Sequence, residues 1–96
     1  MDEFDKAGAA RADCETIACA RVADSPASLE CRLTEIVTLK GTSNFLVLGE
    51  VTGVHIRDEF IVDGKLDITR YRPLTRLGYR DYALISEVFS LKRPGE

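Results

Sequence analysis

The sequence predicts a mainly β protein whose antiparallel sheet is closed or stacked on another layer. Apolar and polar residues alternate over 28–39, which is typical of a strand with one buried face, and the segment DYALISEVFSL, 81–91, indicates a further strand. The segment 44–56 is apolar on both faces at its start. A strand that is buried on both sides belongs to a closed or stacked sheet and not to an isolated ribbon.

Size and charge limit the classes of protein to consider. The 96 residues, 45% hydrophobic and 30% charged, are typical of one small soluble domain, and so small a domain gains stability by association. A net charge of −3 argues against a general nucleic-acid binder, which needs a positive face. The sequence has no run of about 18 apolar residues, and its first residues, MDEFDKAG, are acidic. We therefore expect a cytoplasmic protein without a membrane segment.

The chain is predicted to divide into an arm and a strand-rich part. Residues 1–27 form an acidic, mostly irregular arm with at most one short helical turn near 2–7, because no period of 3.6 or 2 is sustained there. Residues 28–96 carry the strands. The alternation breaks at Glu35 and Ile36, which indicates a bulge. The residues KGTSN, 40–44, suit a hairpin connection to the next strand.

The elements after residue 56 are shorter. A tight turn is predicted at Asp63 and Gly64, where glycine permits a positive φ. Asp67 is predicted to cap a short helical turn over 68–72, which Pro73 ends. The final strand is expected over 81–91, followed by a polar tail.

The three cysteines fit neither a metal knuckle nor a disulfide framework. Cys14, Cys19 and Cys31 are odd in number and have the wrong spacing. We expect them to be reduced, with Cys31 as a buried apolar residue. The alternatives are a Cys14–Cys19 bridge or an adventitious metal. One histidine cannot supply the usual zinc ligand sets, so no metal site is predicted.

His55 is the one histidine, and it follows two glycines on the same predicted strand face. Gly49 and Gly53 weaken a strand interior unless something must approach closely, such as a ring or a neighbouring backbone. The alternative is a barrel corner, at which His55 is only a half-buried cap. No local motif supports a nucleophile beside His55, so hydrolytic chemistry is not predicted.

Arginines are concentrated in residues 66–80, where Asp67 is the one acid. Two interpretations remain open: an anion-binding segment, or arginines that are solvated or paired with the acidic N-terminal residues. The arginines in question are Arg70, Arg72, Arg76 and Arg80.

Several segments in order carry a family resemblance. The succession SPASLECRLTEIV, LGEVTGVHIRDE, VDGKLD and YRPLTRLGYRDYALISEVF resembles the C-terminal half of the flavin reductase-like, FMN-binding split-barrel family. The resemblance implies a six-stranded antiparallel Greek-key barrel that forms a dimer. It also implies that FMN lies in a cleft at the subunit interface, where NADH or NADPH reduces it for a flavin-dependent monooxygenase.

The resemblance also implies roles for individual residues. The histidine that follows G-E-V-x-x-V corresponds to His55, which would lie beside the flavin and nicotinamide and is the candidate catalytic residue. In the segment RLGYRDY, further cofactor contacts are expected near the flavin edge or the partner subunit. These further candidates are Arg76, Tyr79, Arg80 and Tyr82.

The family's N-terminal half, which holds most of the FMN phosphate contacts, has no counterpart in these residues. We therefore expect a barrel that is incomplete in one chain and is completed by a second copy or by a chain with the N-terminal half. Open strand edges favour such pairing. The function expected is that of a flavin reductase, in a truncated form with reduced or no activity. The alternative is a non-catalytic flavin-binding or protein-interaction β-domain.

Overall fold

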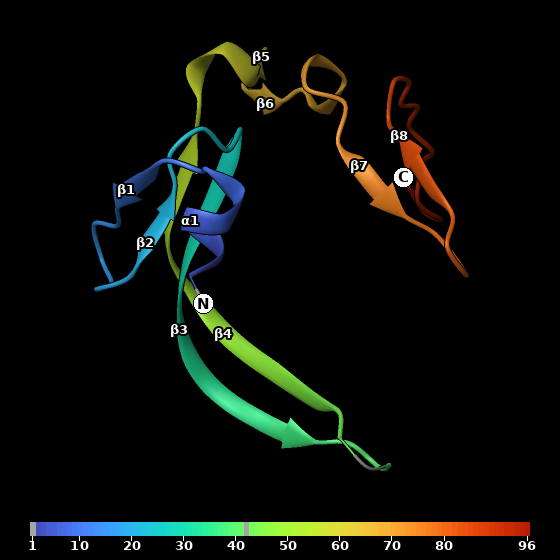
Figure 1. The fold of residues 1–96 in the computed structure, drawn as a ribbon. Coiled ribbons are helices and arrows are strands. Elements are labelled where there is room, and N and C mark those ends of the chain that lie inside the picture. The colour runs from blue at the N-terminus through green and yellow to red at the C-terminus, as the bar shows by residue number, and fades with distance from the viewer. Residues whose placement is uncertain (1, 42) are drawn as a thin grey trace. The chain divides into compact units, whose positions relative to one another are not determined.

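The computed structural model describes residues 2–41 and 43–96. Within these ranges the strands form two-stranded antiparallel sheets, with only short helices between them (Figure 1). The mainly β class predicted from the sequence is therefore confirmed. The chain divides into two units, Met1–Arg57 and Asp58–Glu96, and each is described by itself. No helix in the described ranges is long and apolar enough to cross a membrane.

The first unit begins with a single helical turn, α1 (Glu3–Ala7). Asp2 caps it, because its carboxylate accepts a hydrogen bond from the Phe4 N–H at 2.9 Å. Gly8 ends the helix in the left-handed conformation, with a φ of 68°. The helical turn predicted near residues 2–7 is present.

A short hairpin follows, in the segment that the sequence predicts as mostly irregular. Strand β1 (Arg11–Asp13) pairs antiparallel with β2 (Ala20–Val22). Each strand has three residues, which is too short for an alternating pattern to stand out. This is why the arm over residues 1–27 contains more regular structure than predicted.

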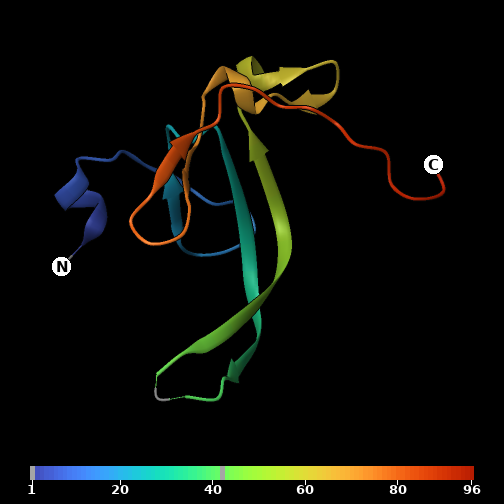
Figure 2. The ribbon, with the colours of Figure 1, turned by 90° about the vertical axis from the view of Figure 1, so that its right-hand side faces the viewer.

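A long hairpin dominates the first unit. Strand β3 (Ala27–Thr38) pairs antiparallel with β4 (Phe45–Ile56), and the two strands curve together along their length (Figure 2). Both strands lie within one residue of the predicted bounds. The predicted connection, 40–44, includes Thr42, which lies outside the described residues. Beside it, the Leu39 N–H donates to the Asn44 carbonyl at 3.1 Å.

Two bulges interrupt the pairing of β3 and β4. At the first, the register shifts between Glu30 and Cys31, and Thr52 of β4 is left without an opposite residue. At the second, the shift lies between Leu33 and Glu35. Here the unpaired residue is on β3, so the second bulge offsets the first and restores the register. The second bulge confirms the one predicted near Glu35, whereas the first was not predicted.

The second unit consists of short hairpins and turns. Its elements are η1 (Asp58–Phe60), β5 (Ile61–Val62), β6 (Lys65–Leu66), η2 (Ile68–Arg70), β7 (Leu74–Arg76) and β8 (Tyr82–Leu84). The predicted tight turn joins β5 to β6, with positive φ at both Asp63 (52°) and Gly64 (76°), as in a type I′ hairpin turn. Asp67 caps η2 as predicted, since its Oδ1 accepts from the Thr69 N–H at 3.0 Å.

The last strand is shorter than predicted. Strand β8 pairs with β7 over Tyr82–Leu84 and ends there, whereas the sequence predicts a strand over 81–91. A strand needs a hydrogen-bonding neighbour, and within the described residues none lies beside 86–91. Val88, Phe89 and Leu91 are correspondingly exposed. The residue types of this segment favour a strand, but no described strand pairs with 86–91.

The described residues hold no buried apolar core. Large apolar side chains on β3 and β4 remain open to solvent, and Phe45 is 64% exposed. Cys31, predicted to be buried, is also exposed, and among the described strands β3 pairs with β4 alone. Single exposed apolar residues are ordinary, but a continuous series along a hairpin is typical of a surface that binds protein, membrane or ligand.

Candidate functional site

Glu30 of β3 is the one buried residue in the described part of the chain, at 1% exposed. Its carboxylate accepts hydrogen bonds from the Glu15 N–H (2.9 Å), the Thr16 N–H (2.6 Å) and the Thr16 hydroxyl (2.6 Å). The ring of His55 supplies a further hydrogen bond, through Nε2. A buried carboxylate is stable only when donors surround it, and Glu30 meets that requirement.

His55 is placed by the register of the long hairpin. Strand β4 pairs His55 with Ser28 and Gly53 with Glu30, so Glu30 and His55 are diagonal neighbours across the two strands. Because a carboxylate can only accept, Nε2 must carry the hydrogen of their bond. In the neutral ring Nδ1 is then the acceptor nitrogen. The His55 side chain is 21% exposed, so its ring is still accessible.

The hydrogen bonds fix the charge of Glu30. The bond from His55, followed by those from the Thr16 hydroxyl and the Glu15 N–H, holds the pKa of the Glu30 carboxyl far below its ordinary value of 4.5. Burial acts in the opposite direction and is outweighed. Glu30 is therefore a carboxylate at neutral pH and binds His55 as an anion.

The two glycines before His55 make room for the neighbouring strand. A Cβ on Gly53 would lie 3.2 Å from Cδ of Glu30, closer than ordinary van der Waals contact. A Cβ on Gly49 would lie 3.3 Å from the Arg32 carbonyl oxygen. The close approach predicted at this glycine stripe therefore comes from β3: its backbone at Gly49, and the Glu30 side chain at Gly53.

The first bulge joins the 14–19 loop to the hairpin. The hydroxyls of Thr16 and Thr52 are hydrogen-bonded at 2.6 Å, and Thr52 is the extra residue of that bulge. The Arg32 guanidinium donates to the Thr16 carbonyl at 3.0 Å. Bulges commonly occur next to functional sites, where they redirect a side chain. Here the bulge holds the loop whose N–H groups bind Glu30.

A hollow of about 340 Å³ opens beside His55. Its lining comes from β2, the following turn and the end of β4: Arg21, Ala23, Ser25, Val54, His55, Ile56 and Arg57. The Nε of Arg21 is buried without an acceptor among the described residues. Two guanidinium groups beside an imidazole give the hollow a positive lining. Guanidinium groups bind anions through charge-assisted hydrogen bonds, so the side chains of Arg21 and Arg57 suit an anionic or acceptor-rich group.

The other predicted site residues lie in the second unit, in the β7–β8 hairpin. Arg76 and Tyr82 are opposite each other in the pairing of β7 with β8. Tyr79 is in the connecting loop, with a φ of 60° and 95% exposed, and Arg80 follows it. The structure thus gathers these four residues on one hairpin. Their contact with a flavin stays a prediction, as does a shared site with His55.

Glu30, Thr16, Arg21 and Arg57 were not predicted as site residues. The alternation of β3 assigns Glu30 to a polar face, and its backbone donors are at Glu15 and Thr16, far away in sequence. The one available signal was Gly53, which indicated that something approaches β4 closely.

With this geometry, the chain has a flavin reductase-like fold of the split-barrel type. Its fold matches the crystal structure of nitrilotriacetate monooxygenase component B from Bacillus cereus, with a TM-score of 0.81 and 26% identity over 93% of this chain and 46% of that one. It also matches the structure of the Pseudomonas fluorescens 2-nitrobenzoate 2-nitroreductase NbaA, with a TM-score of 0.82 and 25% identity over 99% of this chain and 49% of that one. The resemblance stated from the sequence is thereby confirmed.

Sequence comparison gives a further relative. An uncharacterized protein of Halalkalibacterium halodurans is 30% identical over 97 residues, which cover 96% of this chain and 46% of that protein. No family model matches the chain. The chain thus spans about half the length of the proteins it resembles.

Proposed function

We propose that this chain is the flavin-binding part of an NAD(P)H-dependent FMN reductase that serves a partner monooxygenase. The observation that carries the proposal is His55, oriented by the buried Glu30 at the rim of a positively lined hollow. It occurs in a chain whose fold is similar to that of a monooxygenase component and a nitroreductase.

The lining of the hollow is compatible with part of a flavin. FMN combines a flat ring, rich in acceptors, with a phosphate. Arg21 and Arg57 each contribute a guanidinium to the lining. The volume of about 340 Å³ is near the lower end for ligand pockets, which span roughly 300–1,000 Å³. The hollow suits one portion of FMN, and the rest would contact other groups.

In this proposal the cofactors supply the redox chemistry, and the chain supplies binding and orientation. A bound flavin would accept a hydride from NADH or NADPH. Glu30 holds the His55 ring in one orientation, with Nδ1 available to accept a hydrogen bond from a ligand. The β7–β8 hairpin would add contacts at the flavin edge or to a partner subunit. Its contributing residues would be Arg76, Tyr79, Arg80 and Tyr82.

The partners proposed follow from the exposed apolar faces of β3 and β4 and from the share of the relatives that is covered. A second copy of this chain, or a polypeptide with the other half of the fold, would cover those faces. The setting proposed is the cytoplasm, where NADH and NADPH are available.

The alternative is a β-domain without turnover, which binds flavin or a protein partner only. The exposed apolar residues of the long hairpin favour this alternative, because they are suited to protein contact whether or not a cofactor is present.

Steady-state oxidation of NADH in the presence of FMN distinguishes the two. For a reductase, we expect the wild-type chain to oxidise NADH and His55→Asn to lose that activity while keeping its β-rich circular dichroism. Glu50→Gln, an exposed change on the same strand, serves as the matched control and should keep the activity. Saturable FMN binding without NADH oxidation would favour the alternative. If the chain neither binds FMN nor oxidises NADH, the reductase and a flavin-binding domain are both contradicted, and the protein-binding form of the alternative is left.

A further inference from the structure

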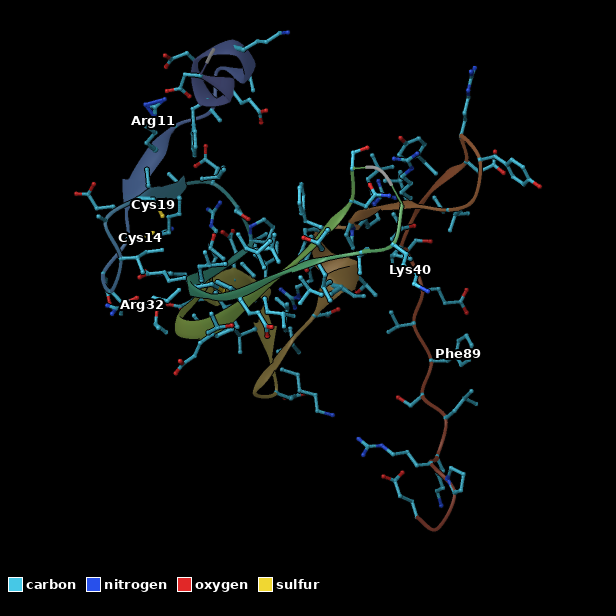
Figure 3. All side chains as sticks on the ribbon, turned by 90° about the horizontal axis from the view of Figure 1, so that it is seen from below. Arg11, Cys14, Cys19, Arg32, Lys40 and Phe89 are labelled. Carbon is cyan, nitrogen blue, oxygen red and sulfur yellow. The ribbon has the colours of Figure 1, made fainter. Side chains whose placement is uncertain are left out.

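Two cysteines face each other at the open end of the β1–β2 hairpin. The last pair of the ladder joins Asp13 to Ala20, so the next positions on the two sides are Cys14 and Cys19. Both are free thiols. Figure 3 shows them next to each other beside the strands. Cys14 and Cys19 lie one step beyond the paired ladder, in which opposite Cα atoms are about 4.5–5.5 Å apart, and a disulfide spans Cα atoms about 4.4–6.8 Å apart.

The two thiols differ in their surroundings. Cys19 is exposed to solvent, whereas Cys14 is partly buried. Burial, together with the negative charge of Glu30 and the neighbouring Cys19 thiol, raises the pKa of Cys14. An exposed thiol next to a protected one is the usual arrangement of an attacking and a resolving cysteine. Of these two thiols, Cys19 is therefore the one that a soluble oxidant reaches first.

The loop between the cysteines is also hydrogen-bonded to Glu30, the residue that orients His55. The N–H groups of Glu15 and Thr16, with the Thr16 hydroxyl, donate to Glu30, and Glu30 in turn binds His55. A covalent link between the two ends of this loop restricts the positions of those donors. A change in the conformation of this loop therefore alters the hydrogen bonds of Glu30, and through Glu30 the position of the His55 ring.

We propose that Cys14 and Cys19 form a reversible disulfide in the presence of peroxide, and that its closure alters the hydrogen bonding of Glu30 and His55. This proposal does not depend on flavin binding. It assigns to the 14–19 loop a redox-sensitive control of the His55 site.

The chemistry balances with hydrogen peroxide as the oxidant. The Cys19 thiolate attacks one peroxide oxygen, the O–O bond breaks, and the departing hydroxide is protonated to water. Cys19 is then a sulfenic acid. The Cys14 sulfur gives up its proton and attacks the Cys19 sulfur, so that the S–S bond forms, the S–O bond breaks, and a second water leaves. Two thiols lose two electrons and two protons, and the peroxide becomes two waters.

Intact-mass measurement after peroxide and then iodoacetamide tests the disulfide. We expect the full chain to lose the mass of two hydrogen atoms, to keep one alkylatable thiol, at Cys31, and to recover all three thiols after reduction. The matched control Cys31→Ser should lose the two hydrogens in the same way, and Cys19→Ser should not. Alkylation of all three cysteines in the treated wild type, or a disulfide that contains Cys31, would overturn the proposal.

The control of His55 has its own readout. His55 is the one histidine of the chain, so its ring protons are identified in an NMR spectrum without further assignment. We expect these resonances to shift when the wild type or Cys31→Ser is oxidised, and to stay unchanged when Cys19→Ser is treated identically. A disulfide that forms without moving the His55 resonances would overturn the proposed control.

Discussion

Glu30 is the residue on which the candidate site depends. One carboxylate binds two backbone N–H groups, one hydroxyl and one imidazole, so it joins the 14–19 loop to the long hairpin and fixes the ring of His55. Removal of the Glu30 carboxylate leaves all of these donors without their acceptor. A donor left without an acceptor away from water costs more free energy than the lost bond itself.

Replacement of Glu30 tests this role. Glu30→Gln keeps the size of the side chain but removes its charge and turns one acceptor into a donor that faces other donors. We expect a lower free energy of unfolding, measured as a lower urea midpoint. Glu35→Gln, an exposed change on the same strand, is the control and should alter the free energy of unfolding by no more than about 0.5 kcal/mol. Equal midpoints for the two variants would contradict the role of Glu30.

The lowered pKa of Glu30 predicts a dependence of stability on pH. Folding favours the ionised form of the Glu30 carboxyl, because its hydrogen-bond donors lower its pKa in the folded state. The resulting gain in the free energy of unfolding is present above the ordinary pKa of 4.5 and is lost as the pH falls toward the lower pKa of the folded state. Urea midpoints measured from neutral to acidic pH should therefore decrease for the wild type. The decrease should be smaller for Glu30→Gln. Identical pH profiles would show that another group is responsible.

At the scale of the elements, the two strands of the long hairpin approach each other closely at Gly49 and Gly53 of β4. Position 53 lies opposite Glu30, and glycine fits there because a Cβ would lie 3.2 Å from Cδ of Glu30. The bulge beside this pair brings Thr52 to the loop that binds Glu30. The site therefore depends on backbone geometry as well as on side-chain identity.

Gly53→Ala tests the close approach. The added methyl group must displace Glu30, so we expect a loss of about 1–3 kcal/mol in the free energy of unfolding, the usual cost of overpacking. A shift of the His55 ring resonances should accompany this loss. Gly78→Ala is the matched control, because a Cβ there meets nothing within 4 Å. If both variants unfold at the same denaturant concentration as the wild type, Gly53 does not have this role.

The elements show what the sequence can and cannot predict. The long strands, the second bulge, the turn at Gly64 and the cap at Asp67 follow from local patterns and were predicted. The β1–β2 hairpin was missed because three-residue strands carry no measurable period. The strand predicted over 81–91 extends beyond the observed strand, because residue types do not show whether a neighbouring strand is present to pair with it. The glycines before it single out His55, whose role stays a prediction, whereas its buried partner Glu30 is bound by donors distant in the sequence.

At the scale of the whole molecule, the apolar surface of β3 and β4 predicts association. In the absence of a covering layer, the purified chain should have a molar mass by light scattering above the 10.6 kDa of one copy, increasing with concentration. The double change Phe45→Lys and Val47→Lys should lower that mass toward one copy. A wild-type chain that stays monomeric at all concentrations would contradict this prediction.

We propose above that the hollow beside His55 belongs to a flavin site. A titration of FMN with the purified chain, followed by flavin fluorescence, tests it most directly. We predict saturable quenching with a fixed ratio of FMN to chain, weakened by about tenfold or more in Arg21→Ala, because charge-assisted hydrogen bonds are among the stronger polar contacts. Fluorescence that stays proportional to free FMN at every protein concentration would contradict the account.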